Sequence, residues 1–165
     1  MPDSTKNPLY TEYRIIQEMH LRLYNQPARP HIYVYPTRYT SHDEAFGKVI
    51  TAVLSAIANY HRTPSEEYRE YIANENIAEI FYKGFDNETI VSDRWHICPI
   101  EVFEHITDKH EYYQSYTYRG YEITENLLRN RYSIQIGGKK ITKQKLNKAF
   151  DFIDGFILDT TYPKF

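Results

Sequence analysis

Histidine and hydroxyl side chains occur at a spacing that phosphoester chemistry uses. The triplets His61-Arg62-Thr63 and His105-Ile106-Thr107 each combine a ring that can act as acid or base with a hydroxyl that can hold a phosphate oxygen. A pair of such triplets on strands would make a small phosphoesterase or nuclease. However, the 44 positions from His61 to His105 are short for the intervening fold, and Thr63 is better explained as a helix cap. Catalysis is therefore our third hypothesis, and we expect the protein not to be an enzyme.

The residues that bind metals do not form a ligand set. Cys98 is the single cysteine, which excludes an internal disulfide and a cysteine zinc site. His42 and His61 stand at opposite ends of an expected helix, roughly 27 Å apart at 1.5 Å per residue. We expect no metal and no cofactor.

Phosphate binding by a cation-rich segment is the chemistry that the sequence favours. Residues 118–150 hold eight Lys and Arg against two Glu, whereas residues 1–117 hold 11 against 17 Asp and Glu. Each Lys or Arg placed on a phosphate backbone releases condensed counterions, so we predict contact with nucleic acid or a nucleoprotein. A merely solvated surface, or pairing with the chain's own acidic half, are the alternatives. The candidate residues are Arg119, Arg129, Arg131, Gln135, Lys139, Lys140, Lys145 and Lys148.

An acidic, tyrosine-rich segment over residues 65–79 suggests a different partner. Carboxylates spaced like phosphates can occupy the basic groove of another protein. The alternative function is therefore a protein–protein inhibitor of a host defence system, of the anti-CRISPR kind. A solvated helix face is the simpler interpretation of the same segment. The candidate contact residues are Glu66, Glu67, Tyr68, Glu70 and Tyr71.

The apolar spacing in the N-terminal two thirds of the chain predicts mainly helices. The strongest signal is the capping box Ser41 and Glu44, which precedes an apolar stripe and predicts a helix over 42–60. The residues HIYVY at 31–35 predict a short strand. Further expected elements are helices over 7–24, 63–84 and 98–106 and a short strand over 88–93.

The hydrophobic period changes to two residues from Tyr112 onward. In RYSIQI, the residues Tyr132, Ile134 and Ile136 alternate with polar ones, so this strand should bury one face only. Gly137-Gly138 fits a two-residue hairpin turn, because glycine accepts positive φ angles. Thr142 should cap a last helix that ends at Gly155.

The expected fold class is α+β. A helical N-terminal part with short strands, residues 1–111, should be followed by a basic strand-strand-helix module, residues 112–165. In this module an antiparallel hairpin or three-stranded sheet is covered by the C-terminal helix, and the two parts could form one continuous domain.

Residues 116–155 resemble a unit that recurs in small phage and mobile-element proteins. The likeness rests on Tyr118-Arg119-Gly120-Tyr121-x-Ile123, a strand, a glycine turn and the helix Ala149-Phe150-x-x-Ile153-Asp154. More distantly, the segment is similar to the three-stranded arm-DNA-binding domains of tyrosine integrases. The resemblance implies a phage or mobile-element origin and a binding role in the host cytoplasm. The first 110 residues resemble no such unit.

The composition is that of a cytoplasmic binding protein. The start MPDSTKNPLY lacks a signal-peptide pattern, and no apolar run approaches the roughly 18 residues of a membrane span. The 17 tyrosines suit half-wet contact surfaces, because each ring can be buried while its hydroxyl stays hydrated.

Overall fold

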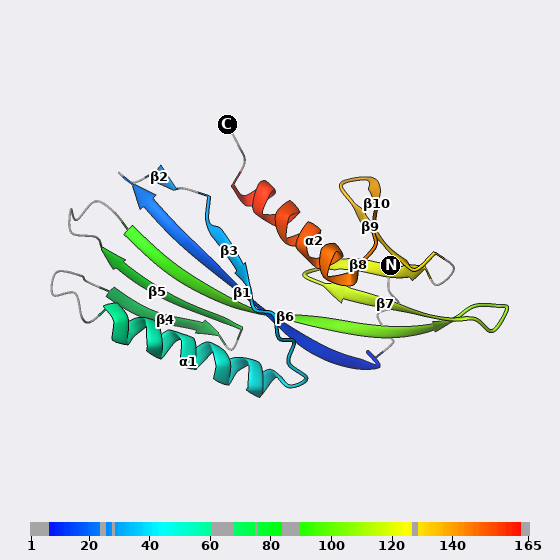
Figure 1. Ribbon diagram of the computed structural model, residues 1–165, viewed down its shortest axis with the longest axis horizontal. Helices are drawn as coiled ribbons and strands as arrows, with labels where there is room; N and C mark the ends of the chain where they lie inside the picture. The colour runs from blue at the N-terminus through cyan, green and yellow to red at the C-terminus, as the bar shows by residue number, and fades with distance from the viewer. Residues whose placement is uncertain are drawn as a thin grey trace. The chain divides into compact units, whose positions relative to one another are not determined.

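The computed structural model describes residues 7–23, 26–27, 29–60, 68–74, 76–83, 90–126 and 129–162. The chain divides into unit 1, residues 1–12 and 99–165, and unit 2, residues 13–98. These ranges contain ten strands, joined in one hydrogen-bonded sheet, and two helices (Figure 1). Strands β1 (Tyr10–Leu23) and β6 (Ile90–Ile106) contribute residues to both units.

Unit 2 is a sheet with one helix on one face. Strand β1 pairs with β2 (Gln26–Pro27) and β3 (His31–Val34), and β6 pairs with β5 (Ile77–Lys83), which pairs with β4 (Tyr68–Asn74). Helix α1 (His42–Tyr60) packs against β5 (Figure 1). Its apolar stripe packs on the strands, and this buries a core of Ile15, Ala45, Val49, Val53, Ala78, Ile80, Trp95 and Ile97.

Two N-terminal predictions are confirmed. The strand expected at 31–35 is β3, and the helix expected over 42–60 is α1. The backbone N–H of Glu44 donates to Ser41 Oγ at 3.2 Å, as a capping box requires. Both predictions rest on residues that are neighbours in the sequence, so they do not depend on contacts with distant parts of the chain.

The helix expected over 7–24 is wrong, because this segment is strand β1. Ile15 and Ile16 are both fully buried, on opposite faces of the sheet. A strand that buries both faces does not alternate between apolar and polar residues. Its apolar residues therefore also matched a helical period.

The helix expected over 63–84 is also wrong. Residues 68–83 contain the antiparallel strands β4 and β5, with Tyr68 opposite Tyr82 and Ile72 opposite Ala78. The Tyr and Ile residues that suggested a helical stripe are equally good strand formers. The Thr63 cap lies outside the described residues.

A single long strand replaces the short strand and short helix expected over 88–106. The residues expected to form the helix, 98–106, belong to β6. Residues Ile90–His96 of β6 pair with β5, and Ile100–Ile106 pair with β7. Pro99 lies where the partner changes. The ladder is interrupted there, so the missing N–H of proline is tolerated.

Unit 1 has four further antiparallel strands and a helix. They are β7 (Tyr112–Tyr118), β8 (Tyr121–Asn126), β9 (Arg131–Ile136), β10 (Lys139–Lys143) and α2 (Leu146–Thr161). Each strand from β6 to β10 pairs with the next, so the expected three-stranded sheet was too small. Gly137 and Gly138 have φ angles of 59° and 75°, which confirms the predicted hairpin turn.

Helix α2 contacts β9 and β10 but differs from the prediction at both ends. Thr142 belongs to β10, and Gly155 lies inside the helix. The predicted core residues Ala149, Phe150 and Ile153 are fully buried, as are Ile134 and most of Ile136 beneath them. The alternation in β9 is thus confirmed.

The predicted fold class is wrong as a whole. The molecule is mostly β, with an antiparallel sheet and two helices in the described ranges, rather than a helical part followed by a small sheet. Neither of these helices is long and apolar enough to cross a membrane.

Candidate nucleic-acid interface

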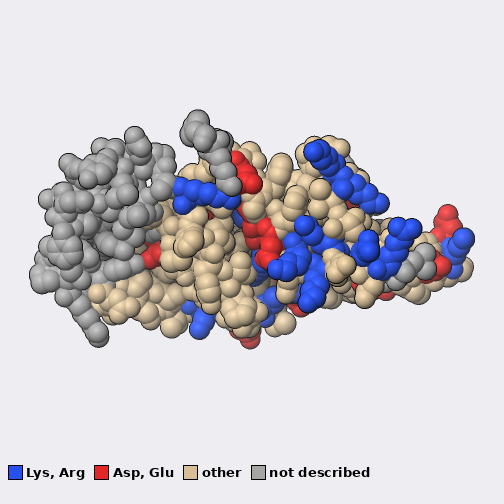
Figure 2. All heavy atoms as spheres, turned by 45° about the horizontal axis from the view of Figure 1, so that its top comes forward, with Lys and Arg blue, Asp and Glu red and all other residues tan. Residues whose placement is uncertain are grey.

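Most of the predicted cations lie exposed on unit 1. They occupy the turn before β9, both strands of the β9–β10 hairpin and the first residues of α2. Figure 2 shows blue Lys and Arg side chains gathered over this part of the surface. No ion pair joins any of them to another residue in the described ranges. We call this set the basic surface. It covers both sides of the hairpin, because Lys139 pairs with the buried Ile136 and points to the α2 side whereas Lys140 points to the other side. Its members are Arg129, Arg131, Lys139, Lys140, Lys145 and Lys148.

The strand register places three of the predicted residues on one face. Lys140 pairs directly with Gln135, and Arg131 precedes Gln135 by four residues on β9. Directly paired residues point to the same side of a sheet, so all three side chains point away from α2. Four residue steps of a strand span about 14 Å at roughly 3.4 Å each. The exposed amide of Gln135 therefore lies beside Lys140, and Arg131 lies about 14 Å further along the hairpin.

The start of α2 adds to the positive potential. Lys145 is the N-cap residue and makes no side-chain capping hydrogen bond, and the first turn holds no acidic residue. The partial positive charge of a helix N-terminus favours anions, and Lys148 lies in the same turn. This end of the helix thus carries two cations where an acidic residue would be more usual.

The lysines of β10 also have a simpler explanation. This strand is an edge strand, with β9 as its neighbour in the sheet order. Natural proteins place lysine on edge strands to prevent pairing with other chains. Lys143, also on β10, makes a cation–π contact inside the unit: its Nζ lies 4.9 Å from the centre of the Phe152 ring. Edge protection does not account for Arg129, Arg131 or Lys148.

Arg119 does not belong to the basic surface. Its Nη1 donates to the buried carboxylate of Asp154 at 2.9 Å, and Tyr118 Oη donates to the same oxygen, also at 2.9 Å. Arg119 and Gly120 form the tight turn between β7 and β8, with φ angles of 49° and 84°. The predicted nucleic-acid contact at Arg119 is therefore corrected to an internal ion pair that fastens α2 to the sheet.

The acidic surface of the alternative hypothesis falls largely beyond what the structure describes. Glu66 and Glu67 lie outside the described residues. Tyr68, Glu70 and Tyr71 belong to β4, where the side chains also lie outside them. Residues 68–74 of the segment form β4 rather than the expected helix, and contact of the acidic side chains with a partner stays a prediction.

A buried carboxylate held by two histidines was missed at the sequence level. Glu18 Oε2 accepts a hydrogen bond from His20 at 2.9 Å, and His96 Nε2 lies 3.1 Å from Glu18 Oε1 at an angle unsuited to a hydrogen bond. Burial raises the pKa of Glu18, but the His20 hydrogen bond and the nearby His96 lower it by more, to well below its usual range. A second buried carboxylate, Glu79, accepts a hydrogen bond from Arg94 Nε. The expected helix over 7–24 concealed this arrangement.

A second histidine contact involves His105 of the predicted catalytic triplets. Its Nε2 is 2.7 Å from Ser115 Oγ, and its ring stacks on Tyr113 with 4.7 Å between centroids. Ser115 is only 1 % exposed. The contact between His105 and Ser115 therefore joins β6 to β7 and has a structural role. His61, the other triplet histidine, lies outside the described residues.

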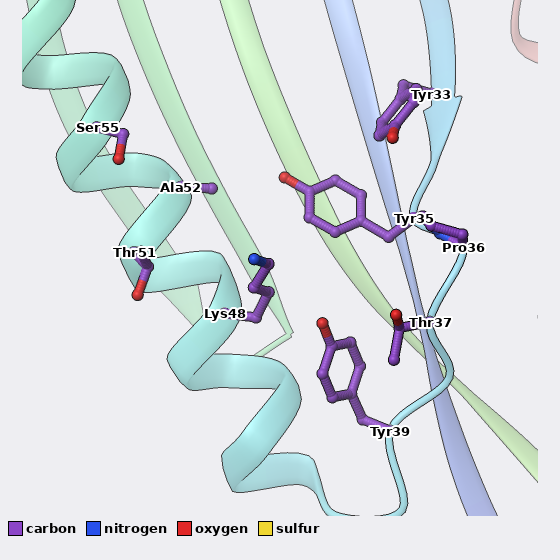
Figure 3. Close-up of a pocket in the computed structure, with 9 residues that line it drawn as sticks. All are labelled: Tyr33, Tyr35, Pro36, Thr37, Tyr39, Lys48, Thr51, Ala52 and Ser55. Carbon is purple, nitrogen blue, oxygen red and sulfur yellow. The ribbon is translucent and has the colours of Figure 1, made fainter.

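Unit 2 contains a tyrosine-lined pocket that the sequence did not single out. It has a volume of about 440 Å³ and lies between α1 and the segment 33–39. Figure 3 shows the hydroxyls of Tyr35 and Tyr39 directed towards the helix, with the amine of Lys48 pointing into the space between. The spacing Tyr33-x-Tyr35-x-x-x-Tyr39 was the signal available, but its meaning depends on the position of α1.

Across the described residues, no group of three or more His, Cys, Asp or Glu side chains is placed to hold a metal ion. No protein family model, curated protein or solved structure matches the chain.

Proposed function

We propose that this protein binds nucleic acid, and that the basic surface of unit 1 contacts the phosphate backbone. The observation that carries the proposal is the exposure of the six cations on one hairpin and the adjoining helix start, without ion pairs to other described residues. Interaction with the chain's own acidic residues was the main competing explanation. Within the described part of the chain, it holds for Arg119, which pairs with Asp154, and for none of the other predicted cations.

The spacing of the cations suits a phosphate backbone. Arg131 and Lys140 lie about 14 Å apart along the hairpin by strand geometry. Two cations this far apart contact different phosphates of one backbone, so each releases its own condensed counterions. Gln135 lies beside Lys140 on the same face. An amide at this position is suited to hydrogen bonding with a base edge or a sugar.

The salt dependence of binding tests this proposal. A ligand that meets all six cations would lose about 10³-fold in affinity between about 50 and 200 mM salt. The double variant Lys139→Ala, Lys140→Ala should reduce the slope of log affinity against log salt by about one for each of the two lysines that contacts a phosphate. Fluorescence anisotropy with a labelled duplex and with a labelled single strand measures both quantities.

Two matched variants serve as controls. Lys139→Arg with Lys140→Arg keeps both charges and should keep the slope. Gln135→Ala changes a neighbouring neutral residue and should also keep the slope, while changing preference among sequences. If affinity varies little with salt, or the alanine double variant behaves like the wild type, the basic surface does not bind phosphates.

The alternative of a protein–protein inhibitor, and the phage origin that the resemblance implied, stay predictions. Capture of a protein partner that persists after nuclease treatment and in the alanine double variant would favour the inhibitor.

A further inference from the structure

The tyrosine pocket of unit 2 carries hydrogen-bond donors and one cation at one end. Figure 3 shows Lys48, Tyr35 and Tyr39 converging from the helix and from the segment that faces it. The hydroxyl of Thr37 also lines this end. None of the described residues that line this pocket carries a carboxylate. Such a set of groups is complementary to an anion.

Tyr35 is held as a hydrogen-bond donor towards the pocket. Trp95 Nε1 donates to Tyr35 Oη at 3.1 Å, which leaves the phenolic proton available to another acceptor. Burial raises the pKa of Tyr35, and the neighbouring tyrosines and Asp93 raise it further against the opposing effect of the Trp95 hydrogen bond. The hydroxyl therefore keeps its proton across the physiological range.

A second hollow of about 330 Å³ shares Tyr35, Ala52 and Ser55 with the first. Its lining includes the carboxylate of Asp93 and the amide of Gln17, whose Nε2 lies 3.4 Å from Asp93 Oδ1. Carboxylates and amides accept hydrogen bonds from the exocyclic amines of bases. The two hollows together thus have a cationic, donating end and an accepting end.

The middle of this groove is aromatic and is open because the facing helix positions are small. Ala52 and Ser55 lie one turn apart on α1, opposite the ring of Tyr35. Tyr33 stands edge-on to Tyr35 with 5.5 Å between centroids and is 51 % exposed, so a flat ring can stack on it. Base–aromatic stacking tolerates any base, because every base has a π-face.

We propose that this pocket binds a nucleoside monophosphate, either free or as the phosphorylated end of a strand. The phosphate contacts Lys48 and the hydroxyls of Tyr35 and Tyr39, and the base lies against the tyrosine rings with its edge towards Asp93 and Gln17. Because the pocket is built from unit 2 residues alone, the proposal does not depend on phosphate binding by unit 1.

The fluorescence of Trp95 reports on the pocket, since it is the only tryptophan of the sequence and its indole N–H donates a hydrogen bond to Tyr35. Titration with AMP should change its emission in a saturable way, and calorimetry should give the same affinity. Adenosine and inorganic phosphate should each bind about tenfold or more weakly than AMP, because each lacks one half of the recognised group. A single strand carrying a 5′-phosphate that binds at least as tightly as AMP identifies a strand end as the ligand. Weaker binding of that strand identifies the free nucleotide.

Two substitutions test the residue assignment. Lys48→Ala should weaken AMP about tenfold or more and leave adenosine unchanged, since the exposed amine contacts the phosphate. Tyr35→Phe should weaken AMP several-fold by removing the donor. Leu54→Ala changes an exposed residue of the same helix outside the pocket and should leave AMP affinity unchanged.

Three results would overturn the assignment. One is the absence of saturable heat and emission change with AMP up to about 10 mM, which corresponds to negligible affinity. Another is an AMP affinity that Lys48→Ala does not alter in a protein with an unchanged melting temperature. The third is tighter binding of a tyrosine-phosphorylated peptide than of AMP, which would indicate a protein ligand.

Discussion

The roles of several charged residues in this protein depend on the groups that lie next to them in the folded chain. Glu18 and Asp154 are both largely buried carboxylates, and each lies close to a group distant in the chain, His96 beside Glu18 and Tyr118 beside Asp154. Arg119, by contrast, looked like a surface cation in the sequence but pairs with Asp154. A buried ion pair costs desolvation energy that only good geometry and added hydrogen bonds offset.

Acid should weaken the fold through Glu18. Its pKa lies below the ordinary value of 4.5 in the folded chain, so its contribution to stability is present above pH 4.5 and is lost as the pH falls from there. Glu18→Gln should lower the free energy of unfolding by about 1–3 kcal/mol at pH 7 and flatten its dependence on pH below 4.5. Urea denaturation across pH measures both effects. Glu104→Gln, at an exposed site, should change neither, and an equal effect of the two substitutions would contradict the role of Glu18.

Removal of the Asp154 carboxylate should destabilise unit 1. Asp154→Ala leaves Arg119 and Tyr118 without the acceptor that both use, and this should cost about 3–5 kcal/mol. Asp154→Asn keeps an oxygen for Tyr118 and should cost less. Chemical denaturation of the three proteins gives the ranking. Equal stability of wild type and Asp154→Ala would show that this cluster is not structural.

Elements were assigned correctly where their signals were local and incorrectly where burial was two-sided. Helix α1 has a capping box and a single apolar stripe, whereas β1 is buried on both faces. The C-terminal end of α2 was also predicted incorrectly from a local signal. Gly155 looked like a helix stop, but α2 continues to Thr161 because packing on the sheet stabilises the helix beyond its local propensity.

Alanine substitutions at two glycines should have opposite effects, because Gly155 lies inside a helix and Gly120 lies in a turn with a positive φ angle. A Cβ added at Gly155 or at Gly120 would meet no atom within 4 Å, so the effect depends on the backbone alone. Gly155→Ala, inside α2, should raise stability by up to about 1 kcal/mol. Gly120→Ala, at a φ of 84°, should lower it by about 1 kcal/mol or more. Thermal melting of both variants checks the opposite signs. A shift in the same direction for both would contradict this account.

At the scale of the whole molecule, the proposed binding is a local property rather than one of net charge. The chain has a net charge of −2 and a pI of about 6.4, so its overall field does not attract nucleic acid. At physiological salt, exposed charges are screened beyond about 8 Å. The potential near a phosphate therefore depends on the basic surface and hardly on remote carboxylates.

A variant with restored net charge tests this point. Lys139→Ala with Lys140→Ala removes two positive charges, and Asp43→Asn with Glu44→Gln on α1 removes two negative ones, so the quadruple variant keeps the wild-type net charge. If binding is local, the quadruple variant should have the weak affinity and reduced salt slope of the lysine double variant. Recovery of wild-type affinity in anisotropy titrations would instead indicate attraction by net charge.

The sequence by itself determined the features that depend on neighbours in the chain. These are the α1 helix with its cap, the Gly137-Gly138 turn, the one-sided burial of β9 and the concentration of cations after Tyr118. Only the tertiary structure decided the strand identity of β1, β4 and β5, the withdrawal of Arg119 and the pocket beside Lys48. The physical reason is that β pairing, two-sided burial and converging side chains join residues far apart in the chain. Periodicity within a short window does not record those contacts.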